Sequence, residues 1–254
     1  MLKKKFGQNF LINDDISQKI INLQEIKNKN ILEIGTGNLA ITKLILKKKP
    51  KKFVGVEIDE DLRNTYSPSI QKHIKFIDAL KFNEIDFFKN EKFSIISNLP
   101  FNISSVLLVK WCKLQNEYNC ISEMTLMFQK ELSERIIAKH NTKKYGRLSI
   151  ITNAFFNVSG KIEVNKENFF PRPKIDALVL KFKPHNKNKI NKIYFSNLEK
   201  ITNFFFNERR KRNKKKIEKL FTKNQIEKYK LDKLYEKRPE NIQSEVFYKM
   251  AEIN

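Results

Sequence analysis

The segment Asn98-Leu99-Pro100-Phe101 combines residue types that could assist chemistry at the amino group of a nucleobase. The 6-amino nitrogen of adenine is a weak nucleophile because its lone pair is delocalised into the ring. Two acceptors aimed at its protons, the side-chain oxygen of Asn98 and the backbone carbonyl of Leu99, would draw this nitrogen towards tetrahedral geometry. Pro100 would stiffen the turn, and Phe101 would offer a flat face for an unstacked base. The segment therefore predicts transfer of a group to an amino nitrogen, although Asn and Pro also favour ordinary turns.

Glycine and acidic residues earlier in the chain could hold a nucleoside cofactor. Gly35-Thr36-Gly37 follows a short apolar run, and glycine lets a ligand lie directly against the backbone. Glu57 lies near the end of the next apolar run and could accept hydrogen bonds from both ribose hydroxyls. Asp78 ends the third run, where it could accept a hydrogen bond from an adenine amino group.

Two cofactor classes fit this pattern, and an ordinary strand-to-helix turn would also explain the glycines. A dinucleotide carries a pyrophosphate, which favours a three-glycine loop at a helix N-terminus. Leu39 stands where the third glycine would be. S-adenosylmethionine (SAM) carries no phosphate and tolerates a shorter glycine motif. The missing glycine and the additional Asp78 therefore favour SAM.

The elements that must position these residues alternate between short apolar runs and longer amphipathic stretches. Six apolar runs are typical of buried strands: Asn30–Ile34, Lys52–Ile58, Ile74–Ile77, Phe93–Ser97, Met124–Phe128 and Ala177–Phe182. Apolar residues have helical spacing over Leu39–Lys48, and a helix is expected after the fifth run, through Ile137. Strands that alternate with helices predict an α/β fold with a parallel, doubly wound sheet.

A second, smaller domain is predicted at the C-terminal end. Residues 184–192 are polar and rich in Asn and Lys, as in a linker. Beyond them, helical patterns span Tyr194–Phe206, Lys214–Phe221 and Ser244–Glu252. We therefore place the α/β domain at residues 1–187 and a small α-helical domain at residues 188–254.

The composition indicates a globular and strongly basic protein. Of the 254 residues, 40% are hydrophobic, and 51 Lys and Arg against 28 Asp and Glu leave a net charge of +23. This excess points to nucleic acid as a partner, although AT-rich codons also raise the Lys content. The chain contains no run of about 18 apolar residues, so no membrane span is expected. The spacing of Cys112, Cys120 and three histidines suits no zinc site, and the lack of an export signal suggests the cytoplasm.

Taken in this order, the motifs resemble those of a known family, the small-subunit ribosomal RNA adenine dimethyltransferases (the KsgA group). The family is related to the erythromycin-resistance methyltransferases. The similar segments are Phe6 to Leu11, Glu33 to Gly37, Glu57 to Asp59, Asp78 to Leu80, Asn98 to Ser104, Gln129 to Glu131, Tyr145 to Leu148, Phe169 to Asp176, Phe206 to Lys211, and Arg238 to Glu240 with Phe247. The last two favour the housekeeping type, as does Asp176, where resistance enzymes usually carry Asn.

The resemblance implies a Rossmann-like SAM-dependent methyltransferase domain followed by a small helical domain. It implies cofactor contacts by Gln8, Asn9, Leu11, Gly35, Gly37, Glu57, Ile58, Asp78, Ala79 and Asn98. It implies catalytic roles for Asn98, Leu99, Pro100, Phe101 and Phe169, with Phe169 as a second aromatic that stacks on the target base. The implied reaction methylates twice each of two adjacent adenosines in the loop of the last hairpin of small-subunit rRNA, during ribosome biogenesis and without a metal. The sequence departs from the family pattern at Thr36, Leu39 and Phe101, where Pro, Gly and Tyr are usual.

A basic run at residues 209–216 is expected to bind RNA. Arg209, Arg210 and Lys211 fall within one of the similar motifs, and proteins hold structured RNA largely through its phosphates. Lys3, Lys4 and Lys5 add charge near the expected cofactor site. The alternative is a solvated face in a lysine-rich protein.

Three other functions remain open at this point. The chain could be a resistance enzyme that methylates a large-subunit adenine, or a non-catalytic ribosome-assembly factor with the same fold. A DNA adenine methyltransferase is more remote, because this length leaves no room for a target-recognition domain. We expect a monomer whose partner is small-subunit rRNA or its precursor particle, with no membrane attachment.

Overall fold

The computed structural model describes residues 8–254 of the chain. Two compact units make up the chain: residues 1–133 with 158–184, and residues 134–157 with 185–254. Phe6 and Gly7 of the opening motif, and the basic residues Lys3 to Lys5, lie outside the described residues.

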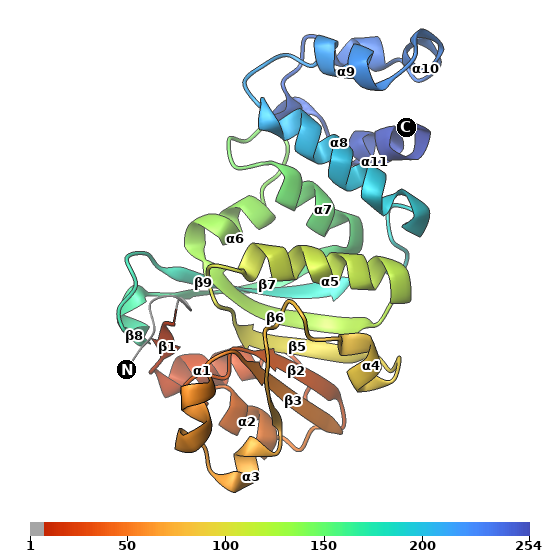
Figure 1. Ribbon diagram of the computed structural model, residues 1–254. Helices are drawn as coiled ribbons and strands as arrows, with labels where there is room; N and C mark the ends of the chain where they lie inside the picture. The colour runs from red at the N-terminus through yellow and green to blue at the C-terminus, as the bar shows by residue number, and fades with distance from the viewer. Residues whose placement is uncertain (1–7) are drawn as a thin grey trace. The chain divides into compact units, whose positions relative to one another are not determined.

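A seven-stranded sheet forms the centre of the first unit, in the order β4-β3-β2-β5-β6-β9-β7 (Figure 1). The strands are β2 (Asn30–Ile34), β3 (Lys52–Glu57), β4 (Ile74–Phe76), β5 (Phe93–Asn98), β6 (Ile121–Gln129), β7 (Phe156–Val164) and β9 (Ala177–Pro184). Strands β2 to β6 pair in parallel, whereas β6 and β9 are antiparallel. Every residue of β2 is buried, as expected for a central parallel strand covered on both faces.

Successive strands are added first on one side of β2 and then on the other, so the strand order reverses between β2 and β5. From β2 it runs outward through β3 to β4, and then returns to add β5 on the other side of β2. Right-handed crossovers therefore place helices on both faces of the sheet. A doubly wound sheet binds its ligand beyond the carboxyl ends of the strands at such a switch point. The segments that follow β2 and β5, which start at Gly35 and Leu99, thus meet at this place.

Short helices connect the strands of this unit. They are α1 (Asp14–Ile21), α2 (Thr42–Lys47), α3 (Pro68–Gln71), α4 (Glu84–Phe88), α5 (Ser104–Tyr118) and the 3₁₀ helices Glu60–Thr65 and Lys166–Asn168. Asn13 caps α1, since its side-chain oxygen accepts the N–H of Ile16 at 3.2 Å. A separate ribbon pairs β1 (Phe10–Leu11) with β8 (Phe169–Phe170).

The second unit is helical. It contains α7 (Arg147–Phe155), α8 (Phe195–Asn207), α9 (Lys214–Leu220), α10 (Lys223–Lys228) and α11 (Ser244–Ile253), with 3₁₀ helices at Lys192–Tyr194, Leu231–Leu234 and Pro239–Asn241. The helix α6 (Lys130–Ile136) spans the division between the units. Aromatic rings join α8 to its neighbours: the centroids of Phe155 and Phe195 lie 5.6 Å apart, and those of Phe205 and Phe247 lie 5.5 Å apart.

The expected boundary after residue 187 lies close to the division at residues 184 and 185, but residues 134–157 are part of the helical unit. The reason is α7, which buries Ile150 and Phe155 against helices from the end of the chain. A buried hydrogen bond from the Tyr248 hydroxyl to the carbonyl of Ile150, 3.0 Å long, adds to this packing. The second unit is therefore built from two separate stretches of sequence.

The expected helix over Leu39–Lys48 begins later, at Thr42. Leu39 adopts a left-handed conformation with φ of +66°, which a helix cannot contain. The sequence pattern also missed β7, whose side chains are mostly exposed and carry no clear apolar run.

Candidate functional site

Two glycines shape the turn after β2. Gly35 has φ of +74°, and its N–H donates to the carbonyl of Val56 at 2.7 Å. A Cβ atom at Gly35 would lie 3.3 Å from the ring of Pro100, and one at Gly37 would lie 2.9 Å from the ring of Phe10. Gly37 also has a positive φ, of +48°. Both positions therefore favour glycine for conformation and for space.

Leu39 has the same left-handed backbone, with φ of +66°, although it carries a full side chain. Its N–H donates to the carbonyl of Thr36 at 2.8 Å, and its side chain is buried in the hydrophobic core. Leu39 thus adopts the left-handed conformation that a third glycine could adopt without strain. Core packing offsets a backbone strain of about 1–2 kcal/mol.

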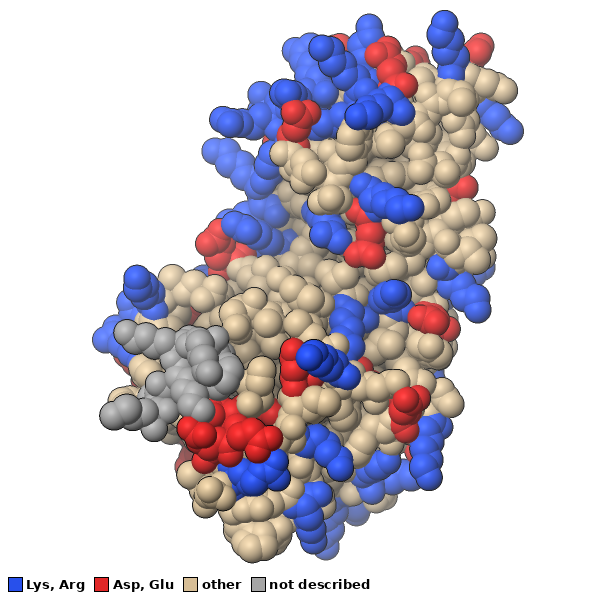
Figure 2. All heavy atoms as spheres, viewed as in Figure 1, with Lys and Arg blue, Asp and Glu red and all other residues tan. Residues whose placement is uncertain are grey.

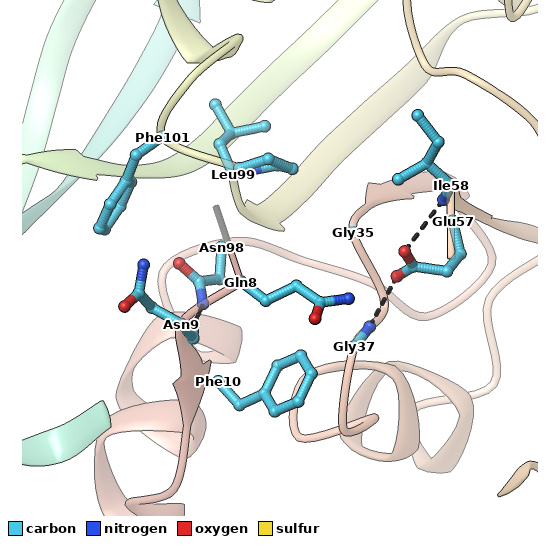
Figure 3. A pocket seen from close by; sticks show the side chains of 11 residues that line it. Gln8, Asn9, Phe10, Gly35, Gly37, Glu57, Ile58, Asn98, Leu99 and Phe101 are labelled. Carbon is cyan, nitrogen blue, oxygen red and sulfur yellow. Dashed lines mark hydrogen bonds between the residues drawn. The ribbon is translucent and has the colours of Figure 1, made fainter. Parts of the chain in front are cut away.

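Glu57, at the end of β3, binds the glycine turn through its carboxylate (Figure 3). One oxygen accepts the N–H of Gly37 at 3.0 Å, and the other accepts the N–H groups of Ile58 and Asp59 at 2.9 and 3.0 Å. The carboxylate has further lone pairs beyond these three bonds. Its remaining lone pairs can accept hydrogen bonds from the hydroxyls of a ribose.

Two adjoining cavities lie at the carboxyl ends of the strands. The first is lined by Gln8, Asn9, Phe10, Gly35, Gly37, Glu57, Ile58, Asn98, Leu99, Pro100 and Phe101 (Figure 3). The second is lined by Ile34, Gly35, Val56, Glu57, Ile58, Ile77, Asp78, Ala79, Leu80, Pro100, Asn102 and Ile103. Four residues line both cavities: Gly35, Glu57, Ile58 and Pro100. The two cavities therefore adjoin, and together they are called the groove below.

Apolar side chains open to solvent line the second cavity. Ile58, Ile77 and Leu80 are 43%, 40% and 39% exposed. Asp78 lies beside them, and one of its carboxylate oxygens accepts the N–H of Leu80 at 2.9 Å. Exposed apolar walls next to a fixed carboxylate suit a flat heterocycle with an amino group, as in adenine.

In the first cavity, Asn98 is held by its amide group. Its Nδ2 donates to the carbonyl of Asn9 at 3.0 Å (Figure 3). This bond fixes the orientation of the amide, because the reverse orientation would set two oxygens against each other. Oδ1 is therefore left as an acceptor beside the cavity. Leu99 is 2% exposed, so it offers the cavity its backbone rather than its side chain.

Most of the site residues expected from the sequence line this groove, but Leu11 and Phe169 do not. These two are opposite one another in the β1–β8 ribbon, and each is only 2% exposed in the hydrophobic core. The neighbouring Phe170 is 61% exposed, because successive residues of a strand face opposite sides. In this structure the ring of Phe169 has no open face on which a base could stack.

The sequence patterns missed a buried group of side chains behind the glycine turn. The hydroxyl of Tyr66 donates to the carbonyl of Gly37 at 2.7 Å and lies 3.1 Å from the hydroxyl of Thr36. Nothing in the sequence singles out Tyr66, which lies outside every recognised motif. Phe10, by contrast, is part of the opening motif and could have been assigned to the site from its position.

A buried acid on β2, just before the turn, contacts the start of α2. The carboxylate of Glu33 accepts the hydroxyl of Thr42 at 2.7 Å, and its side chain is 1% exposed. Burial raises the pKa of Glu33 well above its ordinary value of 4.5, and the nearby charge of Glu57 raises it further, while the bond from Thr42 opposes the shift. Burial at this position therefore disfavours the ionised form of Glu33.

The basic run of the second unit divides into structural and exposed cations. Lys216 is 4% exposed, and its Nζ donates to the carbonyls of Phe205 and Glu208 at 2.7 and 2.9 Å. Burial lowers its pKa. Lys216 thus binds the end of α8 and cannot serve as a phosphate contact, contrary to the expectation for the whole run.

Other members of the run are also engaged within the described chain. Arg209 donates to the carbonyl of Lys143 at 2.7 Å, and Lys211 pairs with Glu208 at 2.6 Å. Arg210 and Lys215 are exposed and have no partner among the described residues. Lys and Arg side chains gather at the end of the unit that contains α9 (Figure 2).

Residues 8–254 contain neither a cluster of metal-binding side chains nor a helix that could span a membrane. No group of three His, Cys, Asp or Glu side chains in this part of the chain could hold a metal ion. None of its helices combines the length and apolar character needed to cross a bilayer.

Comparison with known proteins places the whole chain in one group. Residues 1–253 match the family model described as ribosomal RNA adenine dimethylase. A ribosomal RNA small subunit methyltransferase A from Pelagibacter ubique is 40% identical over 98% of this chain and 95% of its own length. The protein with the same name from Malacoplasma penetrans is 36% identical, over 98% and 90% of the two chains.

Solved structures show the same similarity. A dimethyladenosine transferase from Plasmodium falciparum has a TM-score of 0.74 at 26% identity, over 95% of both chains. The 23S rRNA methyltransferase ErmE has a TM-score of 0.68 at 21% identity, over 96% of this chain and 98% of its own, which is evidence for the fold alone.

Proposed function

Because the chain belongs to the ribosomal RNA adenine dimethylase family, we propose that it dimethylates two adjacent adenosines in the 3′-terminal hairpin loop of small-subunit rRNA. The chain is an rRNA adenine methyltransferase, and its methyl donor is SAM. The relatives that are 33–40% identical carry the small-subunit name, which favours this target over a large-subunit adenine.

The observation that carries the proposal is the fixed amide of Asn98. Its Nδ2 is engaged by Asn9, so Oδ1 can accept a proton of the adenine 6-amino group. The carbonyl of Leu99 accepts the second proton, and Phe101 stacks on the ring of the unstacked adenosine. These preorganised acceptors localise the nitrogen lone pair towards the methyl donor, and such groups contribute strongly because they need no reorganisation.

The residues of the groove fit SAM in chemistry. Bound SAM supplies an electrophilic methyl group on a sulfonium. Glu57 orients the ribose through its free lone pairs, and Asp78 accepts from the adenine amino group between Ile77 and Leu80.

Exposed cations of the second unit, Arg210 and Lys215, are proposed to hold the rRNA backbone. The enzyme acts as a monomer on the precursor of the small subunit, in the cytoplasm. Contacts to the phosphates would position the RNA, and the unpaired bases of the loop would determine which adenosines enter the site. Both features suit recognition of an RNA hairpin.

The test uses purified small subunits that lack the modification, with large subunits and the Asn98→Ala variant assayed in parallel. These are incubated with labelled SAM, and the modified adenosines are mapped and their methyl groups counted. We expect two dimethylated neighbours in the 3′-terminal hairpin. Label in large subunits alone would contradict the proposal, and so would label without a dependence on Asn98.

A further inference from the structure

Lys110, on α5, reaches across to the loop that follows β4. Its Nζ donates to the carbonyls of Ala79 and Phe82 at 3.0 and 2.7 Å, and forms an ion pair with Glu84 at 2.9 Å. An ammonium has three donors. All three are therefore engaged by residues 79–84, and none is left for solvent.

Glu84 is fixed from two sides. Its side chain is 1% exposed at the start of α4, and its second oxygen accepts the indole N–H of Trp111 at 3.0 Å. Trp111 is itself completely buried. Two consecutive residues of α5, Lys110 and Trp111, thus hold one buried carboxylate, and the Lys110 side chain remains only 23% exposed.

These contacts join the two walls of the second cavity. One wall is Asp78-Ala79-Leu80, in the loop that Lys110 binds. The other includes Pro100, Asn102 and Ile103, immediately before α5 begins at Ser104. Because Lys110 is part of α5, its bonds to the loop link the two segments and restrict how far they can separate.

We propose that Lys110, held in place by Glu84, is a positioning residue that sets the width of the second cavity. This cavity is the proposed adenine slot, and its width restricts which cofactor base can enter. This inference depends on the proposed assignment of the second cavity to the adenine of SAM. Lys110 itself does not line the cavity and takes no part in methyl transfer.

The test measures binding of S-adenosylhomocysteine and of its N6-methyladenine analogue by calorimetry. In Lys110→Met the loop loses its anchor, and we expect affinity for S-adenosylhomocysteine to fall about tenfold, as for the loss of hydrogen bonds to a charged group. Affinity for the larger analogue should fall much less, because the slot can now widen. Lys110→Arg retains a cation with several donors and should restore most of the discrimination.

Lys110→Met also leaves the buried Glu84 carboxylate without its cation, which can unfold a protein. The double variant Glu84→Gln/Lys110→Met removes both charges and is measured beside it. Lys113→Met, at an exposed position of the same helix, is the matched control and should leave both affinities unchanged.

An equal loss of affinity for both ligands in the folded variants would show a general structural effect and overturn the inference, as would unchanged affinities. Failure of the wild-type protein to bind S-adenosylhomocysteine would instead overturn the cofactor site itself.

Discussion

The side-chain amide of Asn98 donates to the backbone carbonyl of Asn9, a residue 89 positions earlier in the chain. The bond joins the end of β5 to the segment that leads into β1. The orientation of the proposed catalytic acceptor is thus set by a part of the chain that carries no catalytic group of its own.

Replacement of Asn98 by alanine should remove the acceptor and leave the fold intact. We expect turnover to fall about 100- to 1000-fold, the usual effect of losing one preorganised hydrogen-bonding group. Single-turnover methylation of small subunits measures the effect, with SAM affinity and melting temperature as controls. Methylation near the wild-type rate would exclude Asn98 as the acceptor.

Glu57→Ala should weaken SAM binding by about 1–3 kcal/mol, because the ribose hydroxyls lose a charged acceptor. The melting temperature should fall as well, since the same carboxylate binds the N–H groups of Gly37, Ile58 and Asp59. Calorimetric titration with SAM and thermal unfolding separate the two effects. If only the melting temperature changed, Glu57 would be a purely structural residue.

Arg210→Ala/Lys215→Ala should weaken RNA binding and reduce its dependence on salt. Each lost phosphate contact lowers the slope of log affinity against log salt concentration by about 0.7 to 0.9. Binding to the hairpin is measured at several salt concentrations. The control is Lys19→Ala/Lys27→Ala, which removes two exposed cations from the first unit. Equal slopes for the two double variants would mean that only net charge matters.

Glu33→Gln should change how stability depends on pH. Between pH 4.5 and the raised pKa of the folded state, the unfolded chain has lost the Glu33 proton while the folded chain retains it. The free energy of unfolding of the wild type therefore falls as pH rises through this window. The variant lacks this contribution, so its melting temperature relative to wild type should rise as pH increases from 5 towards the raised pKa of the folded state. A constant difference would show that Glu33 is ionised throughout.

Leu39→Gly tests which of two opposing effects is larger. Glycine relieves a backbone strain of about 1–2 kcal/mol, whereas loss of a buried leucine side chain costs about 2–5 kcal/mol. We expect the variant to be less stable in denaturant unfolding. A gain in stability would show that strain dominates at φ of +66°.

Buried parallel strands and their glycine turn leave local signals in the sequence, and the expected site residues other than Leu11 and Phe169 line the groove. Phe169 and Phe170 show a feature that local sequence signals do not predict. Which of them faces outward depends on pairing with β1, so it follows from register with a distant segment rather than from the motif. The burial of Lys216 in the basic run also depends on tertiary packing. Seven cations look alike in sequence, and only the packing of α9 on the end of α8 makes one of them a buried anchor.

The helical unit takes in residues 134–157 from the middle of the chain, and this has a consequence for synthesis on the ribosome. When α7 leaves the ribosome, the helices α8 and α11 that cover its apolar face have not yet been translated. Its buried residues Ile150, Ile151 and Phe155 then stay exposed to water or to chaperones until the last helix emerges. The C-terminal region is therefore needed to complete folding of an earlier segment. A chain that stops near residue 187 would leave the apolar face of α7 exposed and prone to aggregation.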